Sequence, residues 1–228
     1  AYGFKGLHGR VLPTAAGASI ANTNLPVIAI GGDGGSLDEG MHHFIHTIRN
    51  NYNVTFIMHN NCNFGLTTGQ ETPTTPKGQP MAATPWGAVG ERINPVQLAM
   101  VSGASWIANG WTGNTKQVGD LITAGMNHKG FSFINVYQDC PTYNKFENLE
   151  WLRNKVQNVE EIEGYDPTNW EMAFKAVDYN ADKRPVGIVY TKEDSPDFMD
   201  RMTYQTDKSP LKDQVRVYPV EHLLEEFK

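Results

Sequence analysis

The 228-residue chain has little cysteine, no excess of positive charge and no long apolar run. Its two cysteines, Cys62 and Cys140, are too few for a disulfide framework and are typical of a reducing compartment, so we expect a cytoplasmic protein. No stretch approaches the roughly 18 consecutive apolar residues that cross a bilayer, and the chain does not open on a charged-then-apolar signal segment. The formal net charge of −6 argues against a general nucleic-acid binder, which would show a basic face, although it leaves room for a local basic patch. We therefore expect neither a membrane nor a nucleic acid as partner.

The apolar segments that are present predict an α/β fold, with a mostly parallel sheet and helices on both faces. An all-apolar strand at residues 27–30 precedes a helix at 37–50 and a second strand at 54–58. This order is the β–turn–α–β unit from which parallel sheets are built. The remaining predicted elements are helices at 11–21, 95–102, 117–126, 149–156 and 222–227, and strands at 105–108, 131–137 and 186–190.

Residues 60–92 interrupt this alternation with repeated glycine and proline and no periodicity. Loops of this length are unusual in a compact domain and are commonly functional. We assign residues 1–150 to an α/β core that holds the site, and residues 151–228 to a C-terminal extension that completes the same domain.

The segment IGGDGGS, residues 30–36, places a single carboxylate, Asp33, among glycines directly after the first predicted strand. Asn61 follows the second predicted strand, and the carboxyl ends of neighbouring parallel strands meet at one edge of a sheet. Carboxylate and amide oxygens suit Mg²⁺, which commonly shares its coordination with phosphates, and the glycines allow close approach of a diphosphate. The alternative is a plain tight turn in which Ser36 or Asp38 caps the following helix.

Several short motifs occur in a specific order, although any one of them alone would be weak evidence. They are GLHGR at 6–10, GGDGG at 31–35, HHFIHTIRNN at 42–51, NNCNFGLTTGQ at 60–70, TTPKG at 74–78 and YQDCPTYNKF at 137–146. Together they resemble the β subunit of the 2-oxoacid:ferredoxin oxidoreductases, of the 2-oxoglutarate or pyruvate type, and RPVGIVY at 184–190 also fits. The resemblance implies a thiamine-diphosphate-binding fold.

The same resemblance implies a site for thiamine diphosphate and Mg²⁺. The side chains of Asp33 and Asn61 and the main-chain oxygen of Asn63 would bind Mg²⁺, and Leu66 and Thr68 would face the substrate. The residues that would contact the cofactor are His8, Gly32, Asp33, Gly34, Gly35, Asn61, Asn63, Gly65, Leu66 and Thr67.

Cys140, in the CPTYN segment, would by the same resemblance be a ligand of a [4Fe–4S] cluster. Such clusters normally need four thiolates, and this sequence has two cysteines. The family's other ligands lie in an N-terminal cysteine-containing segment that the sequence lacks, so we expect them outside this chain or in a part not represented in it. The alternative for Cys140 is an ordinary buried thiol, and we expect a structural role for Cys62.

The implied activity is the coenzyme A-dependent oxidative decarboxylation of a 2-oxoacid, with electrons passing through the cluster to ferredoxin. The TTPKG loop favours 2-oxoglutarate as substrate. The glutamate that activates the cofactor would belong to a partner α subunit, so no catalytic residue is assigned to this chain. Two alternatives remain: a non-redox thiamine-diphosphate decarboxylase or synthase, and a non-catalytic cofactor-binding subunit.

For the remaining histidines and charged residues that we considered, the sequence predicts structural or surface roles. The histidines within residues 42–46 have helical spacing but no evident further ligand, so we expect packing or supporting roles for them. Lys77, Arg92 and Lys116 are scattered along the sequence, and we expect them on the solvated surface together with the acidic stretch at 160–163.

Overall fold

The computed structural model describes residues 3–204, 209–214 and 225. The helix predicted at residues 222–227 lies outside the described residues except for residue 225. In the part of the chain that is described, no helix combines the length and the apolar character needed to cross a membrane.

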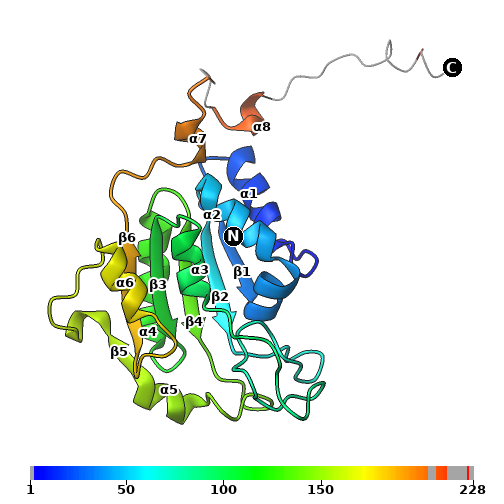
Figure 1. The fold of residues 1–228 in the computed structure, drawn as a ribbon. Helices are drawn as coiled ribbons and strands as arrows, with labels where there is room; N and C mark the ends of the chain where they lie inside the picture. The colour runs from blue at the N-terminus through cyan, green and yellow to red at the C-terminus, as the bar shows by residue number, and fades with distance from the viewer. Residues whose placement is uncertain (1–2, 205–208, 215–224, 226–228) are drawn as a thin grey trace.

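A central sheet organises the described chain (Figure 1), and its strands follow the order β1-β2-β4-β3-β6-β5. β1, β2, β4 and β3 run parallel to one another, whereas β6 is antiparallel to β3 and carries the short β5 at the sheet edge. The fold class is therefore α/β with a mostly parallel sheet, as predicted. The strands are β1 (Ile28–Gly32), β2 (Thr55–Asn60), β3 (Trp106–Trp111), β4 (Ser132–Tyr137), β5 (Val156–Asn158) and β6 (Arg184–Thr191).

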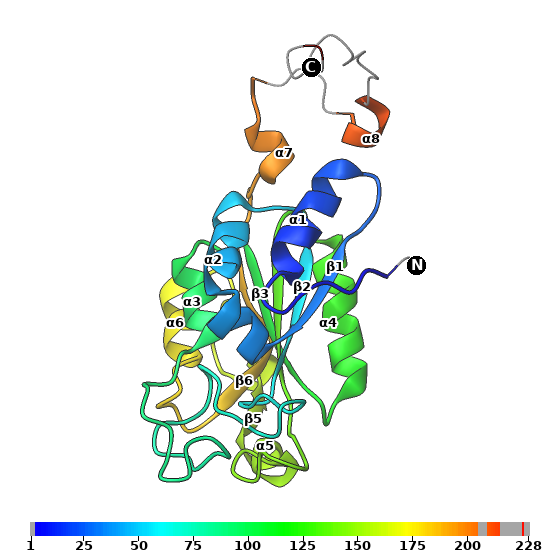
Figure 2. The ribbon, with the colours of Figure 1, turned by 90° about the vertical axis from the view of Figure 1, so that its right-hand side faces the viewer.

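Helices cover both faces of this sheet (Figure 2), with α4 on one side and α2, α3 and α6 on the other. α4 packs on β3 and β4, while α1 packs against α2 and β1. The longer helices are α1 (Val11–Ala21), α2 (Met41–Asn50), α3 (Pro95–Val101), α4 (Thr115–Asn127), α5 (Leu149–Lys155) and α6 (Trp170–Ala176). The shorter ones are the π-helix η1 (Gly35–Glu39), the 3-10 helix η2 (Val159–Glu161), α7 (Phe198–Arg201) and α8 (Leu211–Gln214).

Four phenylalanines form the centre of the core between the sheet and α2. Phe44 of α2 and Phe133 of β4 meet edge to face with ring centroids 5.1 Å apart, and Phe56 of β2 stacks on Phe133 at 5.8 Å. Phe131, just before β4, completes the group, and all four side chains are fully buried. Burial of each such ring contributes roughly 1.5–3 kcal/mol relative to exposure, so this group fixes α2 on the parallel strands.

The predicted helix at residues 37–50 consists of two elements, because the chain bends at Gly40. A Cβ at Gly40 would lie 2.7 Å from the main-chain oxygen of Gly9 and 2.9 Å from that of Gly35. This close approach permits only glycine at the bend, and it separates η1 from α2. The GLHGR segment is thereby held against the turn that follows β1.

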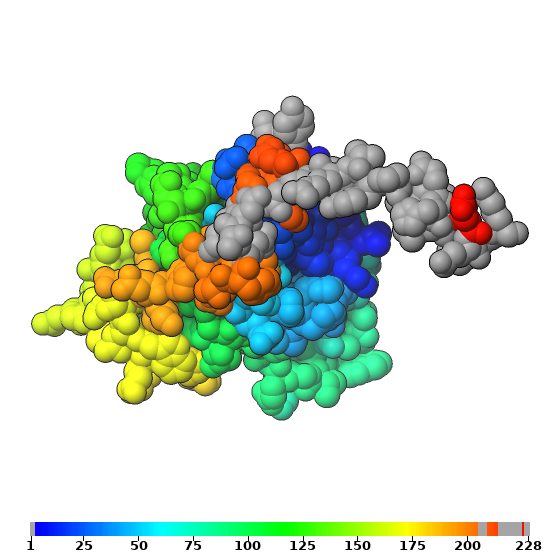
Figure 3. Space-filling model, turned by 90° about the horizontal axis from the view of Figure 1, so that it is seen from above, coloured from blue at the N-terminus to red at the C-terminus, as the bar shows by residue number. Residues whose placement is uncertain are grey.

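The segment around α7 lies at the amino end of the parallel strands (Figure 1), on the side of the molecule that faces the viewer in Figure 3. Asn51, in a left-handed conformation with φ 54°, donates from Nδ2 to the main-chain oxygen of Pro196 at 3.0 Å. Arg201 donates to the main-chain oxygen of Arg49 at 3.0 Å. The opposite, carboxyl end of the strands is left to the long loop at residues 61–94, which contains no helix or named strand.

Candidate functional site

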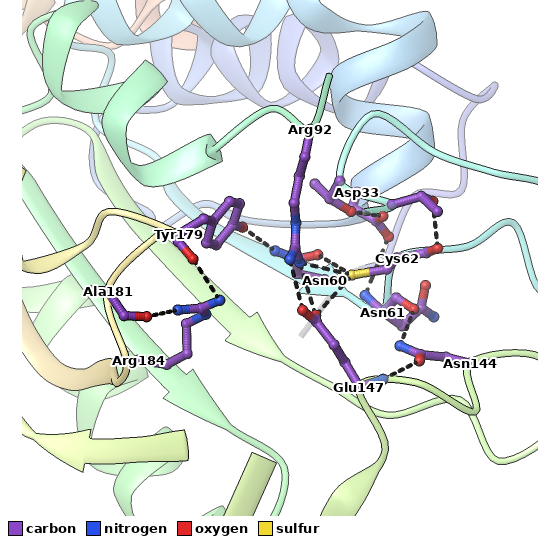
Figure 4. A network of polar contacts seen from close by, with 12 residues as sticks. Asp33, Asn60, Asn61, Cys62, Arg92, Asn144, Glu147, Tyr179, Ala181 and Arg184 are labelled. Carbon is purple, nitrogen blue, oxygen red and sulfur yellow. Dashed lines mark hydrogen bonds and ion pairs between the residues drawn. The ribbon is translucent and has the colours of Figure 1, made fainter. Parts of the chain in front are cut away.

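The ends of β1 and β2 bring the two predicted metal ligands together. The strands pair in parallel with Gly32 opposite His59, so the chain continues from neighbouring points into Asp33 and Asn61. The main-chain N–H of Asn61 lies 3.4 Å from Oδ1 of Asp33 and donates to it (Figure 4). The structure thus brings the carboxylate and the asparagine side by side, as parallel-sheet geometry predicts.

Asp33 is almost fully buried, with an exposed fraction of 1%. Its Oδ2 accepts hydrogen bonds from the hydroxyls of Thr72 at 2.6 Å and Thr74 at 2.5 Å. Burial raises the pKa of Asp33 above its ordinary value, although the bonds from Thr72, Thr74 and the Asn61 amide act to lower it. None of the described residues forms an ion pair with this carboxylate. A buried carboxylate without a cationic partner is costly, so a bound cation would be strongly favoured here.

The turn at residues 61–63 supplies further oxygen atoms beside the carboxylate. Cys62 has a left-handed conformation with φ 57°, which folds Asn63 back so that its Nδ2 donates to the main-chain oxygen of Asn61 at 2.8 Å. The side-chain oxygen of Asn63 is buried and has no hydrogen-bond partner. Carboxylate and amide oxygens form the ligand set that Mg²⁺ prefers, so the donors present at this turn fit that ion.

A cavity of about 460 Å³ opens at these strand ends. Lys5 and Phe64 also line it, and the sequence reasoning missed both, although Lys5 directly precedes the GLHGR motif. Thr68, predicted to face the substrate, is not among the lining residues, whereas Leu66 lies at the rim with 92% of its surface exposed. Every residue predicted to contact the cofactor lines the cavity: His8, Gly32, Asp33, Gly34, Gly35, Asn61, Asn63, Gly65, Leu66 and Thr67.

The glycine turn after β1 is not held by a side-chain cap. Gly34 and Gly40, the residues that precede η1 and α2, provide no side-chain cap, and the buried Ser36 hydroxyl has no partner. A Cβ at Gly34 would lie 2.4 Å from the ring of Phe64. The capped-turn alternative is therefore wrong for Ser36 and Asp38, and the glycine instead provides clearance at the wall of the cavity.

Cys140 lies in the loop after β4, and its surroundings stabilise a thiolate. Burial acts to raise its pKa, but the main-chain N–H groups of Tyr143, Thr142 and Asn144 and the Asn63 side chain lower it below the ordinary value. Across the described ranges, no group of three or more His, Cys, Asp or Glu side chains could hold a metal ion. Cys140 could thus serve only as one ligand of a metal centre completed from elsewhere.

The expectation of a solvated Arg92 is wrong. Its guanidinium makes two hydrogen bonds to Glu147, at 2.7 and 2.8 Å, and lies over the ring of Tyr179 with 4.0 Å to the centroid (Figure 4). Burial acts to lower the pKa of Arg92, but Tyr179, Cys62 and Glu147 outweigh it and raise the pKa above its ordinary value.

The buried thiol of Cys62 lies 3.4 Å from Arg92 Nη2 and 3.5 Å from Glu147 Oε2. Its pKa is raised well above the usual range by burial, which supports a structural role.

A second set of contacts joins this ion pair to the turn at residues 61–63. Asn144 accepts from the main-chain N–H of Glu147 at 2.9 Å and donates from Nδ2 to the main-chain oxygen of Asn61 at 2.9 Å. The loop that carries Cys140 is therefore tied to the turn that carries Asn61. Lys77 and Lys116, in contrast, are exposed as expected.

Comparisons with known proteins agree with this geometry. The family described as thiamine pyrophosphate enzyme, C-terminal TPP binding domain, matches residues 1–136. The C-terminal family of the pyruvate ferredoxin oxidoreductase beta subunit matches residues 140–207. The 2-oxoacid:ferredoxin oxidoreductase 2 subunit beta of Aeropyrum pernix is 36% identical over 208 residues, which cover 87% of this chain and 67% of that protein.

Two further relatives are named for 2-oxoglutarate. The 2-oxoglutarate oxidoreductase subunit KorB of Mycobacterium tuberculosis is 36% identical over 143 residues, covering 63% of this chain and 38% of that protein. A solved structure of the 2-oxoglutarate:ferredoxin oxidoreductase of Magnetococcus marinus, with 2-oxoglutarate, coenzyme A and succinyl-CoA bound, has a TM-score of 0.81. It is 28% identical and covers 97% of this chain and 74% of that one.

Proposed function

We propose that this chain, which belongs to the β-subunit family of the 2-oxoacid:ferredoxin oxidoreductases, holds thiamine diphosphate through Mg²⁺ at the carboxyl ends of β1 and β2. The observation that carries the proposal is the buried Asp33 carboxylate, which has hydroxyl and amide donors but no cationic partner among the described residues. Asn63, whose buried side-chain oxygen has no hydrogen-bond partner, lines the same cavity. A divalent cation at this place would compensate the negative charge of the Asp33 carboxylate.

In this proposal the side chains of Asp33 and Asn61 and the main chain of Asn63 bind the metal. Gly34 and Gly35 let the backbone approach the diphosphate. When bound, thiamine diphosphate supplies the carbanion chemistry by which a 2-oxoacid loses carbon dioxide. The remaining predicted contacts are His8, Gly32, Gly65, Leu66 and Thr67 to the cofactor, and Leu66 and Thr68 to the substrate.

The proposed reaction converts a 2-oxoacid and coenzyme A into carbon dioxide and an acyl-coenzyme A. The two electrons released leave one at a time through a [4Fe–4S] cluster to ferredoxin. Cys140 would supply one thiolate of the cluster, and the other ligands would come from outside this chain. An α subunit is the implied partner within the oxidoreductase, and we propose that it provides the activating glutamate. We favour 2-oxoglutarate as substrate, because the KorB relatives and the similar solved structure are named for it.

We also propose a single domain and a cytoplasmic location for this chain. β6, within residues 151–228, lies in the same sheet as the strands that carry the site, which supports a single domain with a core at residues 1–150. A cytoplasmic location agrees with the scarcity of cysteine.

The test is to purify the complex of this chain with its partner subunit and to measure bound thiamine diphosphate, Mg²⁺ and iron. We expect all three, and a visible cluster absorbance that bleaches when 2-oxoglutarate and coenzyme A are added together. Pyruvate in place of 2-oxoglutarate tests the substrate preference. Bound thiamine diphosphate without iron would favour the non-redox alternative, and a complex without thiamine diphosphate would refute the proposal.

A further inference from the structure

Three threonine hydroxyls gather behind the proposed metal site, on the long loop between β2 and α3. Thr72, Thr74 and Thr75, here called the threonine cluster, have exposed fractions of 6%, 0% and 2%. We propose that the threonine cluster positions both halves of the metal site, so that Asp33 and the turn at residues 61–63 present their oxygens to one ion. The inference rests on the proposed function, because it assigns a role toward the same Mg²⁺.

The first half of the site is Asp33. The Thr72 and Thr74 hydroxyls both donate to its Oδ2, at 2.6 and 2.5 Å. Oδ2 is engaged by two hydroxyl donors, whereas Oδ1 accepts from the main-chain N–H of Asn61 at 3.4 Å and has a further lone pair for a cation. The two hydroxyls therefore fix the rotation of the carboxylate as well as its place.

The second half is the turn centred on Cys62. The Thr75 hydroxyl donates to the main-chain oxygen of Cys62 at 2.7 Å and accepts from the main-chain N–H of Thr72 at 2.8 Å. Cys62 lies between Asn61 and Asn63 in a left-handed conformation, so its carbonyl direction is coupled to that of both neighbours. Thr75 thus holds the turn that carries the other predicted ligands.

The arrangement allows little redistribution of these bonds. A threonine hydroxyl has one hydrogen to donate, and in the threonine cluster each of these hydrogens goes to Asp33 or to Cys62. Thr72 lies within 3.2 Å of Thr74 and 3.3 Å of Thr75 between hydroxyl oxygens, which makes the three residues one unit. Removal of one hydroxyl would leave a buried acceptor short of a donor.

Metal affinity distinguishes positioning from a general effect on folding. The test uses the purified complex at saturating thiamine diphosphate, with Mn²⁺ in place of Mg²⁺ and the electron paramagnetic resonance signal of free Mn²⁺ as the readout. Residues that orient a metal ligand typically affect metal affinity by about 10- to 100-fold. We expect a loss in that range for Thr74→Val and for Thr75→Val, and a near-native affinity for Thr74→Ser, which restores the hydroxyl.

Thr47→Val is the matched control. The Thr47 hydroxyl is buried in α2 and donates to the main-chain oxygen of His43 at 2.7 Å, away from the cavity. This variant should melt at a lower temperature than the native complex but bind Mn²⁺ with the native affinity.

The outcomes separate the two levels of the proposal. If the native complex binds no Mn²⁺ in the presence of thiamine diphosphate, the proposed function itself fails. If the native complex binds Mn²⁺ and both valine variants bind it equally well, only the positioning role of the threonine cluster is overturned. Should Thr74→Val fail to assemble, Thr75→Val decides, because the hydrogen bonds that it removes join neutral main-chain groups, the carbonyl of Cys62 and the N–H of Thr72, and both hydroxyl donors to Asp33 remain.

Discussion

The ion pair between Arg92 and Glu147 gives a quantitative prediction about the loop beside the site. Both side chains are largely buried, at 13% and 12% exposure, and they share two short hydrogen bonds. Removal of one partner of a buried pair typically destabilises a protein by about 3–5 kcal/mol, because the other charge is left uncompensated. The variants Glu147→Gln and Arg92→Met differ in the buried group that remains without its partner.

Glu147→Gln leaves a guanidinium that cannot lose its charge in a protein, so we expect a loss of about 3–5 kcal/mol that is nearly independent of pH. Arg92→Met leaves a carboxyl group that can take up a proton. Keeping a glutamate of ordinary acidity neutral costs about 3.7 kcal/mol at pH 7 and about 1 kcal/mol at pH 5. Burial without a cationic partner favours the neutral acid, whereas a glutamate in the unfolded chain ionises above about pH 4.3. The stability of Arg92→Met should therefore fall as pH rises.

The assay is urea unfolding of each variant at pH 5 and pH 7, followed by circular dichroism. Relative to the native protein, Arg92→Met should be destabilised by about 2–3 kcal/mol more at pH 7 than at pH 5. The double variant Arg92→Met/Glu147→Met should regain much of the loss, since buried pairs are often replaceable by apolar residues. The control is Asp182→Asn, which removes the charge of the exposed ion pair with Lys155 and should change the free energy of unfolding by less than about 1 kcal/mol. The reasoning would be refuted if both Arg92→Met and Glu147→Gln lowered the free energy of unfolding by less than about 1 kcal/mol. It would also be refuted if the stability of the two variants depended on pH to the same extent.

Three further substitutions have direct readouts. Gly9→Ala places a Cβ at φ 70° and 2.9 Å from the main chain of Glu39, so thermal unfolding should show a loss of at least about 1–2 kcal/mol. Gly34→Ala should displace the Phe64 ring and weaken thiamine diphosphate binding in a calorimetric titration, whereas Gly17→Ala, which meets nothing within 4 Å in α1, should bind normally. Cys140→Ser should lose iron but keep thiamine diphosphate; unchanged iron content would exclude it as a cluster ligand.

The sequence predicts the position of the candidate site well, because the site depends on strand ends. Apolar runs locate β1 and β2, and parallel pairing then requires Asp33 and Asn61 to be neighbours. The bend at Gly40 was missed, since helical periodicity continues across it while the constraint comes from the main chain of Gly9, which is distant in sequence.

Other features depend on contacts that no local pattern records. The apolar segment of β6 predicts a strand but not its antiparallel direction against β3. Arg92 and Glu147 are 55 positions apart, and their burial together follows only from the fold of the long loop. The bonds of Thr72 and Thr74 to Asp33 span 39 and 41 positions and are equally invisible in the sequence.

The most direct test of the central claim is the Mg²⁺ dependence of thiamine diphosphate binding in an Asp33→Asn variant. Asp197→Asn is the control, because Asp197 is also buried but caps α7 at the other end of the sheet. We predict that the native complex binds thiamine diphosphate only with Mg²⁺ and that Asp197→Asn does the same. Asp33→Asn should lose more than the roughly 100-fold that removal of a supporting residue costs. Native, Mg²⁺-dependent affinity in Asp33→Asn would contradict the account.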